Sequence, residues 1–428
     1  MNRTMINELS AKEGQTVFIQ GWVQGLRGQS KIKFLQLRDR TGVVQCVGFD
    51  QSLFEKFAKL MTESVISITG LVKPANIKSD EVTIKTLEIE IKELEIINLA
   101  EVLPFNVVEK DQTIVTELNK RLDYRFLDLH KREVQAIFKI QSTLLHAYRD
   151  FMFEEGALEC VFPSIIGTSS EGGTEVFPVK YFEKTALLSQ SCQLYKQMLA
   201  CSMEKIFTVF TVWRAEKHNT LRHLNESRQM DFEMAFTDDK GVMDILGRCV
   251  QYIVKRILEK NQPELELLKA KVEVPKVKYM TFHEVAKIMK EQHVHMGEDD
   301  LSGEAEEKLG QLYPHTIVFV HDWPLIGKTF YIMPKGEELS YGFDAIYNGM
   351  EISSGGQRIH LPDLLTERLI ARDCNPDNFK SYIDSFRFGA PPHAGWGVGV
   401  ERLTMQILGI KNIREVTLFP RDRDRLTP

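Results

Sequence analysis

The chain has 428 residues, of which 43% are hydrophobic and 27% charged, a composition typical of a globular protein with two or more domains. No apolar run reaches about 18 residues and the N-terminus lacks the apolar region of a signal peptide, so we expect a cytoplasmic protein with no membrane partner. The net charge of −6 argues against a nonspecific nucleic-acid coat but permits a local basic face for RNA. The six cysteines form no Cys-x-x-Cys pair, which predicts reduced thiols and no structural zinc.

Five short β-strands are predicted within the first 100 residues. Apolar and polar residues alternate in each of them, and Asp39-Arg40-Thr41-Gly42 is a turn signal between the second and the third. A short helical insert is expected at residues 52–61. Five strands with one insert fit a small Greek-key barrel of the OB type, which binds single-stranded nucleic acid on one open face. The predicted strands span residues 17–23, 32–39, 43–49, 64–72 and 82–89.

One face of this barrel has the residue types that bind single-stranded RNA. Phe34 offers a flat ring on which a base can stack. In isolation, a phenylalanine in a strand is more often part of the core, so its role depends on the rest of the chain. Positive charge on the same face is expected from Arg27, Lys31, Lys33, Arg38 and Arg40.

The chain between the barrel and the following domain is predicted to form a hinge at residues 101–130. A long amphipathic helix follows, with apolar residues at helical spacing from Val134 to Phe151, and Gly156 ends it. A strand at residues 158–163 then closes on Pro163. The next segment, residues 168–175, is small, polar and glycine-containing, as expected of a flexible loop.

A charged hairpin is predicted from residue 206 to residue 236. An apolar strand at 206–213 is followed by a polar loop and a returning strand at 230–236, in which Asp231 and Glu233 share one face. Arg214 follows the first strand, and its planar fork suits a phosphate or a carboxylate. On spacing alone, a surface hairpin stabilised by ion pairs is an equally good interpretation. Further directed contacts are expected from Glu216, Arg222 and His223.

The second half of the chain predicts an antiparallel sheet flanked by helices. A helix is expected at residues 240–259, then a charged, peripheral insertion at about 263–338. Its acidic runs at 297–300 and 303–307 are interpreted as solvated surface, because the EF-hand spacing is missing. No Gly-x-x-x-x-Gly-Lys-Ser/Thr loop is present, which disfavours a P-loop ATPase. Core strands are expected at residues 316–320, 329–334 and 341–347.

A glycine-containing segment near the C-terminus favours an anion-binding site at the charged hairpin over a surface hairpin stabilised by ion pairs. In Gly397-Val398-Gly399-Val400-Glu401-Arg402-Leu403, glycines lead into an apolar helical pattern, so a phosphate can approach the backbone closely. Together with Trp213-Arg214-Ala215-Glu216, this segment resembles motifs 2 and 3 of the class II aminoacyl-tRNA synthetases. Residues 189–196, 351–358 and 419–428 resemble the aspartyl subgroup of class IIb in its archaeal and eukaryotic form.

This resemblance covers nearly the whole chain and implies both a fold and a function. The fold class is α+β: an OB-fold anticodon-binding domain at 1–100, the hinge at 101–130, and a class II catalytic domain at 131–428 that contains the insertion. The function is that of an aspartate–tRNA ligase, which activates L-aspartate with ATP to aspartyl-AMP and transfers the aspartyl group to tRNA-Asp. The helix and strand before Pro163 correspond to motif 1, which implies a homodimer.

The resemblance also assigns roles to residues of the catalytic domain. Arg214 and Arg402 are the catalytic residues, Arg214 on the α-phosphate and the substrate α-carboxylate, and Arg402 on the γ-phosphate. Lys196 and Arg358 grip the side-chain carboxylate of aspartate. The aspartate-binding set is Glu171, Gln193, Lys196, Arg214, Asp231, Ser354 and Arg358. The ATP-binding set is Arg214, Glu216, Arg222, His223, Leu224, Glu351, Gly399, Val400, Glu401 and Arg402.

Two further ligands are implied. Asp344, Glu351 and Ser354 supply hard oxygen atoms suited to Mg²⁺, although ion pairs of the two carboxylates with nearby arginines are an alternative. In the barrel, the anticodon is expected to contact Arg27, Phe34, Gln45 and Glu88.

Three positions depart from the family pattern. Cys192 replaces a common proline, with little effect expected, and Ser227-Arg228 replaces a common aromatic residue, which removes one source of adenine stacking. Gln24 differs from the bulky residue expected in enzymes strict for tRNA-Asp, so charging of tRNA-Asn stays open.

Three alternatives to the aspartate–tRNA ligase remain. One is an asparaginyl-tRNA synthetase, against which Lys196 and Arg358 argue. Another is an amide ligase that resembles asparagine synthetase A and uses ammonia as acceptor, although the barrel favours tRNA. A third is a noncatalytic RNA-binding paralogue, which should have lost phosphate-binding arginines, whereas Arg214 and Arg402 are both present.

Overall fold

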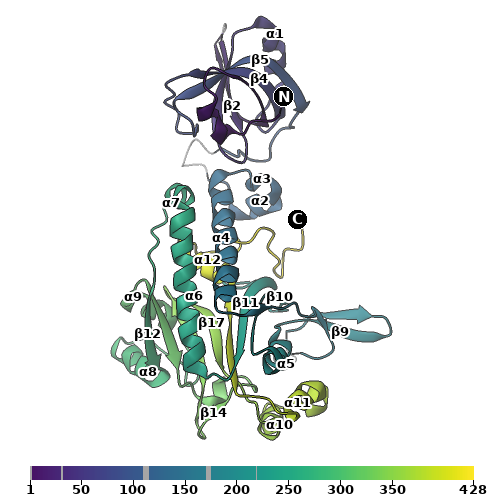
Figure 1. Cartoon of the computed structure of the whole chain (residues 1–428), viewed down its shortest axis with the longest axis vertical. Coiled ribbons are helices and arrows are strands. Elements are labelled where there is room, and N and C mark those ends of the chain that lie inside the picture. The colour runs from purple at the N-terminus through teal and green to yellow at the C-terminus, as the bar shows by residue number, and fades with distance from the viewer. Residues whose placement is uncertain (1, 30–31, 109–114, 170–174, 218) are drawn as a thin grey trace. The chain divides into compact units, whose positions relative to one another are not determined.

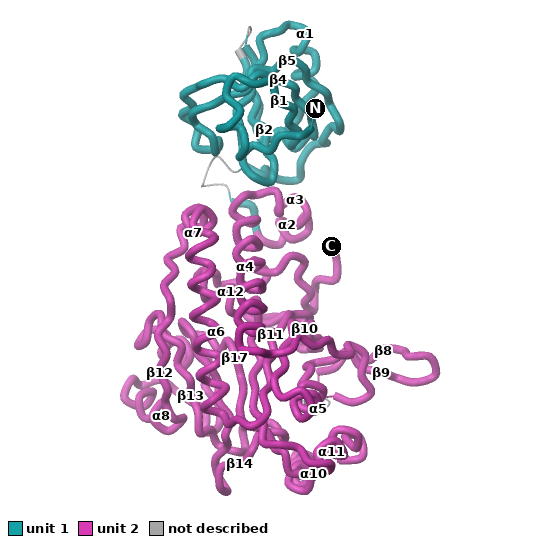
Figure 2. Tube along the Cα trace, viewed as in Figure 1, with its two compact units in different colours: residues 1–117 teal, residues 118–428 magenta. Residues whose placement is uncertain are grey.

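A computed structural model shows how the chain folds into two compact units, residues 1–117 and residues 118–428 (Figures 1 and 2). The structure describes residues 2–29, 32–108, 115–169, 175–217 and 219–428. No helix in this part of the chain is long and apolar enough to cross a membrane.

Unit 1 is a closed five-stranded barrel in which the strands follow the order β1-β2-β3-β5-β4. Its interior is filled by alternate residues of every strand, among them Val23, Leu37, Cys46 and Ile68. The predicted OB-type barrel is therefore confirmed. Its elements are a 3-10 helix η1 (Ile6–Ala11), β1 (Thr16–Gln29), β2 (Ile32–Arg38), β3 (Val43–Gly48), α1 (Gln51–Lys59), β4 (Val65–Pro74) and β5 (Leu87–Asn98).

The fifth strand differs from its prediction. It was expected at residues 82–89, but it begins at Leu87 and runs to Asn98. Residues 82–84 are held on the barrel in another way, since the Thr83 backbone N–H donates to the Val43 carbonyl at 2.9 Å without forming a strand. The buried apolar residues of β5 extend as far as Leu94, beyond residue 89, where the predicted strand ended.

Unit 2 is built on an eight-stranded sheet of order β12-β13-β16-β17-β18-β11-β10-β6. Most neighbours are antiparallel, as predicted, but β12–β13 and β6–β10 are parallel pairs. The predicted hairpin is β10–β11, in which the polar loop lies between residues 213 and 226. The strands are β6 (Leu158–Glu159), β10 (Lys205–Trp213), β11 (Glu226–Ala235), β12 (Lys276–Thr281), β13 (Thr316–His321), β16 (Gly342–Tyr347), β17 (Met350–Gln357) and β18 (His393–Gly399).

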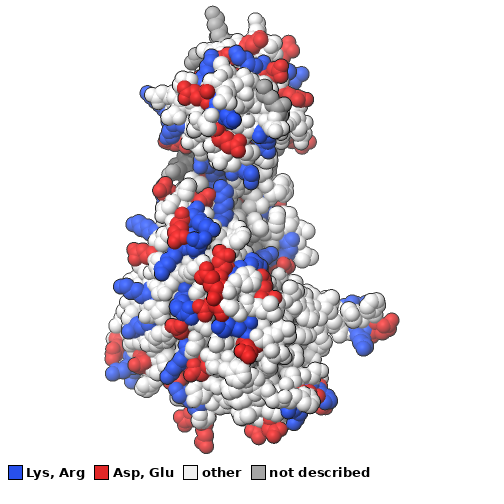
Figure 3. Space-filling view, viewed as in Figure 1, with Lys and Arg blue, Asp and Glu red and all other residues white. Residues whose placement is uncertain are grey.

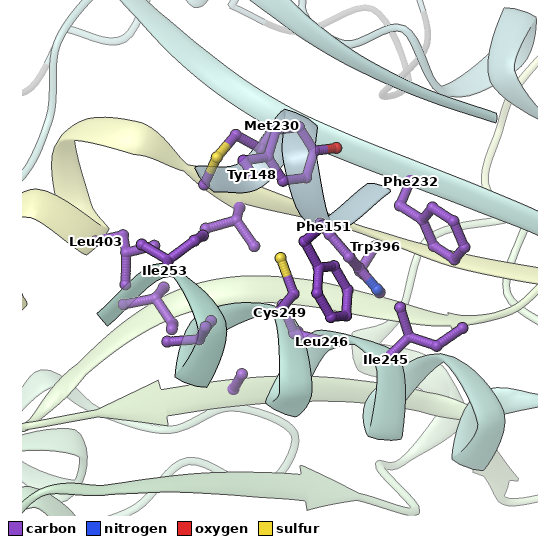
Figure 4. Close-up of a cluster of buried hydrophobic side chains, with 14 of the residues drawn as sticks. Tyr148, Phe151, Met230, Phe232, Ile245, Leu246, Cys249, Ile253, Trp396 and Leu403 are labelled. Atoms are coloured by element: carbon purple, nitrogen blue, oxygen red, sulfur yellow. The ribbon is translucent and has the colours of Figure 1, made fainter. Parts of the chain in front are cut away.

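Two long helices, α4 (Arg132–Glu154) and α6 (Asp239–Lys260), lie side by side against this sheet (Figure 1). Between the helices and the sheet lies the largest hydrophobic core, which Figure 4 shows around Tyr148, Cys249 and Trp396. The Tyr148 hydroxyl donates to the backbone carbonyl of Asp231 at 2.8 Å, so the core also fixes the strand that carries Asp231. Of the shorter helices, α7 (Gln262–Leu268) and α12 (Val400–Leu408) pack against α4, while α2 (Leu118–Asp123) and α3 (Arg125–Asp128) pack against each other and precede α4 in the chain.

The predicted insertion contributes two strands to the sheet, β12 and β13, together with α8 (Phe282–Glu291) and α9 (Gly303–Leu312). The strand expected at 329–334 is wrong: most of this segment is irregular and packs its apolar residues, such as Phe330 and Ile332, against a separate cluster. That cluster includes α10 (Pro362–Ile370) and α11 (Lys380–Arg387). The remaining elements are β7 (Ile165–Ile166), β8 (Pro178–Tyr181), β9 (Lys184–Leu188), α5 (Gln193–Met203), η2 (Leu325–Gly327), β14 (Pro334–Lys335), β15 (Leu339–Ser340) and η3 (Pro376–Phe379).

Candidate active site

A cavity of about 330 Å³ in unit 2 collects residues that are far apart in the sequence. It is lined from the β10–β11 hairpin, α5, β17, β18 and α12. The predicted site residues on its wall are Gln193, Lys196, Arg214, Glu216, Arg222, His223, Leu224, Asp231, Glu351, Ser354, Arg358, Gly399, Glu401 and Arg402. Of the others, Val400 and Asp344 do not line this cavity, and Glu171 lies outside the described residues.

One end of the cavity contains a cluster of four buried charges. The Lys196 Nζ lies 2.8 Å from Asp231 Oδ1 and 3.5 Å from Glu233 Oε2. Arg358 donates from Nε to the other oxygen of Glu233 at 2.9 Å. Burial alone would lower the pKa of Lys196, but the two carboxylates outweigh it and the net shift is upward. Likewise the pKa of Glu233 is lowered, because Arg358 and Lys196 outweigh the effect of burial. Two opposing carboxylates hold the Lys196 ammonium charged, and the Arg358 guanidinium and the Lys196 ammonium likewise hold Glu233 charged.

The neighbouring strand β18 leaves room for these carboxylates. Asp231 and Glu233 point to the same face of β11, and their partners across the ladder are Gly397 and Gly395. A methyl group on Gly395 would lie only 2.1 Å from Glu233 Oε2 and 2.2 Å from the Phe232 carbonyl oxygen. A side chain at Gly395 would therefore displace the Glu233 carboxylate. The sequence prediction noted Glu233 without giving it a role.

A hydrogen-bonded network that the sequence did not predict orients Gln193. The Gln193 amide donates to Gln197 Oε1 at 2.8 Å, and the Tyr382 hydroxyl donates to the same oxygen at 2.7 Å. Gln197 in turn lies 3.0 Å from Nε2 of His393, whose Nδ1 lies 2.9 Å from the Pro391 carbonyl. Burial lowers the pKa of His393, which keeps its ring neutral. Gln197 is one helical turn after Gln193, the only sequence signal for this contact.

The other end of the cavity contains cations that are less buried. Arg402, in the first turn of α12, donates to the Glu351 carbonyl at 3.2 Å and lies 3.5 Å from the Glu351 carboxylate. His223 Nε2 lies 3.4 Å from the same guanidinium. Arg214 is about 40% exposed, and the Glu216 carboxylate is 3.9 Å away. These side chains are accessible to an anion, because exposed pairs at such distances are weak.

Glu306 corrects one of the sequence interpretations. Its acidic run, residues 303–307, was expected to be solvated surface, but the Glu306 side chain is only 14% exposed and accepts from Arg222 at 2.9 Å. Burial and the nearby Glu351 raise the pKa of Glu306 to about 7, against the opposing effect of Arg222. The insertion therefore contributes a carboxylate beside the predicted ATP-binding residues.

The Glu401 side chain is buried against Arg228, whereas a residue that contacts ATP is expected to be accessible. Its side chain is 2% exposed and accepts from the Arg228 backbone N–H at 3.1 Å and from the Arg228 guanidinium at 3.3 Å. Arg228 is one of the two residues that depart from the family pattern. This pair connects β11 to the start of α12, so Glu401 fixes the helix that carries Arg402.

The barrel of unit 1 brings the predicted anticodon residues close together. Gln45 pairs in register with Glu88, and its amide donates to the Glu88 carboxylate at 2.8 Å. Phe34 on β2 is half-buried, and Arg27, which is 62% exposed at its side chain, is its partner across the ladder with β1. These four residues therefore occupy neighbouring positions on β1, β2, β3 and β5.

Arg38 does not contribute positive charge to the barrel surface, contrary to the prediction. It is buried, and both of its terminal nitrogens donate to Glu63, at 3.0 and 2.6 Å. Arg40 is exposed as expected, and Lys31 lies outside the described residues. Gln24, one of the departures from the family pattern, lies at a bulge in β1 and donates to the Glu81 carbonyl at 3.5 Å. Residues 79–81 therefore rest against this part of the barrel, where Gln36 also donates to Ser79.

Each of the two units matches a known protein family. Residues 117–423 match the model described as tRNA synthetases class II (D, K and N), and residues 17–97 match an OB-fold nucleic acid binding domain. The chain is a class II tRNA synthetase. The family and the α+β fold predicted from the sequence are confirmed.

Individual relatives of this synthetase agree with the aspartyl subgroup. An aspartate–tRNA(Asp/Asn) ligase of Archaeoglobus fulgidus is 44% identical over 97% of both chains, and an aspartate–tRNA(Asp) ligase of Pyrococcus horikoshii is 41% identical over 99% of this chain and 98% of its own. Among solved structures, an asparaginyl-tRNA synthetase from P. horikoshii in complex with asparaginyl-adenylate has a TM-score of 0.93 at 30% identity, with full coverage of both chains. An aspartyl-tRNA synthetase from Entamoeba histolytica has a TM-score of 0.89 at 32% identity, covering 100% of this chain and 93% of its own.

Class II synthetases use ATP and typically Mg²⁺, and the synthetase has oxygen donors that fit this ion. Asp344 on β16 is paired in register with Ser354 on β17, and Glu351 is three residues before Ser354. Burial raises the pKa of Asp344, Glu351 raises it further, and Lys328, whose Nζ lies 2.5 Å away, opposes both. The predicted alternative of carboxylate–arginine pairs holds for Glu351, which faces Arg402, while Asp344 pairs with a lysine. Within the described ranges, no three His, Cys, Asp or Glu side chains alone form a metal site.

Proposed function

We propose that this synthetase is an aspartate–tRNA ligase that converts L-aspartate and ATP to aspartyl-AMP and pyrophosphate and then transfers the aspartyl group to tRNA-Asp. The observation that carries this proposal is the pair of buried cations, Lys196 and Arg358, at one end of the cavity. With Arg214 they supply three positive charges, against two negative charges from Asp231 and Glu233. The surplus of one matches the net charge of the aspartate zwitterion, whereas asparagine is neutral overall.

The cavity also supports a specific place for the amino group of the substrate. Among the described residues, Asp231 Oδ2 is buried and has no hydrogen-bond donor. An unsatisfied buried carboxylate oxygen costs about 1–3 kcal/mol, more when charged, and an α-ammonium group would satisfy it. The amide oxygen of Gln193, whose N–H group is bound by Gln197, is a second acceptor on the same wall. Glu171 is proposed from the resemblance alone.

The nucleotide end supports the chemistry of adenylate formation. An aspartate carboxylate oxygen attacks the α-phosphorus, and negative charge grows on the α-phosphate and on the departing pyrophosphate. Arg214 is proposed to stabilise the α-phosphate, while Arg402, assisted by Arg222 and His223, binds the γ-phosphate. Magnesium held by Asp344, Glu351 and Ser354 would neutralise phosphate charge when bound. Rate enhancement then comes from positioning and fixed charge, without a protein acid or base.

Two alternatives are disfavoured by particular features. In an asparagine-specific enzyme, the one positive charge by which Lys196, Arg358 and Arg214 exceed Asp231 and Glu233 would meet no substrate carboxylate. An ammonia-dependent amide ligase would not need an anticodon-reading barrel, and unit 1 matches a nucleic acid binding domain. We therefore assign unit 1 to the anticodon, with Arg27, Phe34, Gln45 and Glu88 as its contacts and residues 101–130 as the hinge.

Both tRNA-Asp and tRNA-Asn are proposed as acceptors. The anticodons of the two tRNAs share their first two bases, and Phe34, Gln45 and Glu88 are assigned to the central uridine that both contain. Gln24 stands where a bulkier residue is expected in strict enzymes. The relative from A. fulgidus, whose name includes both tRNAs, is slightly more similar to this chain than the one from P. horikoshii, whose name includes only tRNA-Asp.

A homodimer formed through α4 and the strand that follows it is also proposed. Exposed apolar residues gather after this helix: Val161 is 94% exposed, and Leu158 and Ile165 are about half exposed. Figure 3 shows that the surface over β10 and α5 has few charged side chains. Exposed apolar residues on a surface with few charges are typical of subunit interfaces.

The first test measures exchange of labelled pyrophosphate into ATP. The synthetase should catalyse exchange with aspartate but not with asparagine, and chelation of magnesium by EDTA should abolish it. Arg214→Ala should lower kcat/KM by roughly 10²–10³-fold, the typical loss for one charge-stabilising donor. Arg256→Ala, on α6 at a residue that pairs with Glu259 and does not line the cavity, is the matched control and should have no effect. Absence of aspartate-dependent exchange in the wild type would refute the proposed substrate.

The second test measures charging of purified tRNA-Asp and tRNA-Asn with labelled aspartate. Both tRNAs should be charged. Phe34→Ala should raise KM for both by roughly 10-fold or more, because a base stack is worth about 1–3 kcal/mol, while aspartate-dependent exchange stays unchanged. Charging of tRNA-Asp alone would limit the proposal to one acceptor, and exchange without charging of either tRNA would favour the amide ligase.

The third test is the mass in solution. Sedimentation equilibrium should give about twice the chain mass of 49.3 kDa. Val161→Glu would bury a charge in the interface and should shift the mass toward that of the monomer, whereas Val102→Glu, at a valine in the proposed hinge that is 83% exposed, should not. A monomeric wild type at micromolar concentration would contradict the proposed dimer.

A further inference from the structure

Glu306 connects the insertion to the nucleotide end of the cavity. It is 84 positions from Arg222 in the sequence, yet its carboxylate accepts from Arg222 Nη1 at 2.9 Å. Arg222 lines the cavity, and Glu306 does not. The carboxylate is therefore behind the guanidinium as seen from the cavity.

The backbone of the insertion holds this carboxylate in place. α9 packs against the turn between β16 and β17 so closely that a methyl group on Gly310 would lie 2.3 Å from the Gly349 backbone nitrogen. Glu306 and Gly310 are four residues apart and therefore share one face of α9, the face that meets this turn. The helix begins with a side-chain cap, in which Ser302 accepts from the Ala305 N–H. Glu306 thus projects from a fixed element, while Arg222 comes from the long β10–β11 loop.

We propose that Glu306 is a positioning residue for ATP, which holds the Arg222 guanidinium in the orientation that receives the triphosphate. This inference rests on the proposed function and assigns to it a residue from the insertion. An arginine has five N–H donors, and the bond to Glu306 uses one nitrogen, so the others stay available to phosphate oxygens. An unrestrained arginine loses side-chain entropy when it is fixed, and Glu306 reduces the part of this cost that falls on ATP binding.

The same geometry predicts that the effect of Glu306 depends on Arg222. With Arg222 present, the carboxylate is neutralised and orients a phosphate-binding cation. Without Arg222, which opposes the upward shift of the Glu306 pKa, Glu306 is mostly neutral near pH 7 and no longer orients a phosphate-binding cation. Removal of the Glu306 charge should therefore weaken ATP binding in one background and not in the other.

The experiment is a double-mutant cycle of Glu306→Gln and Arg222→Ala, read by KM for ATP, KM for aspartate and kcat in pyrophosphate exchange. Glu306→Gln alone should raise KM for ATP by roughly 5–10-fold, as expected for loss of a charge-assisted hydrogen bond, and leave KM for aspartate within twofold. In the Arg222→Ala background, Glu306→Gln should leave KM for ATP unchanged. The exposed residues Glu304 and Glu307 on the same helix provide the controls Glu304→Gln and Glu307→Gln, which should behave as the wild type.

Three outcomes would overturn the inference. An equal loss from Glu306→Gln in both backgrounds would mean that Glu306 only stabilises α9, and a rise in KM for aspartate would mean a general distortion of the cavity. Equal ATP affinity of the wild type and Glu306→Gln would mean that the ion pair has no role. Calorimetric titration of each variant with ATP and magnesium needs no amino acid, so it tests Glu306 even if aspartate-dependent exchange fails.

Discussion

The structure depends on one buried cluster of opposite charges, in which Lys196 and Arg358 face Asp231 and Glu233. Each of these charges would cost several kcal/mol to bury alone, and removal of one member would leave its partner unpaired. Neighbouring residues provide the space and the backbone support that these buried charges need. Strand β18 has glycines opposite both carboxylates, and the core residue Tyr148 bonds to the backbone of Asp231. The hydrophobic core thereby fixes the charges that the cavity presents.

The antiparallel sheet places this cluster at one end of the cavity and the proposed nucleotide-binding residues at the other. β11 and β18 are neighbours, so the residues after Gly399 enter α12 beside the β10–β11 loop, and Arg402 arrives near His223. β17 lies on the other side of β18 and contributes Glu351 and Ser354. The charges of the amino-acid end are buried and paired, whereas the cations of the nucleotide end are less buried. This division suits a reaction in which specificity comes from buried charge and catalysis from accessible cations that meet a polyanion.

Much of this arrangement could be predicted from the sequence, because its parts are local. The hairpin around Arg214, the glycine segment before Arg402 and the Gln193–Lys196 helix each carry their signal within about ten residues. The missed features are contacts between distant segments or depend on packing. Glu306 looked like solvated surface because nothing in residues 303–307 shows that Arg222 lies across from it. Arg38 looked like an RNA contact, but its buried partner Glu63 is 25 positions away. The strand expected at 329–334 has the right composition, yet its apolar residues pack without joining the sheet.

The central claim is that buried charge, matched to a dicarboxylic amino acid, selects the substrate. It is tested most directly by calorimetric titration with two stable analogues of the acyl-adenylate, aspartyl- and asparaginyl-sulfamoyl adenosine, which differ only in the side-chain carboxylate or amide. The account predicts that the aspartyl analogue binds on the order of 10³-fold more tightly, about 4 kcal/mol, because the amide would leave the surplus positive charge of Lys196, Arg358 and Arg214 unmatched. Equal affinities, or tighter binding of the asparaginyl analogue, would contradict it.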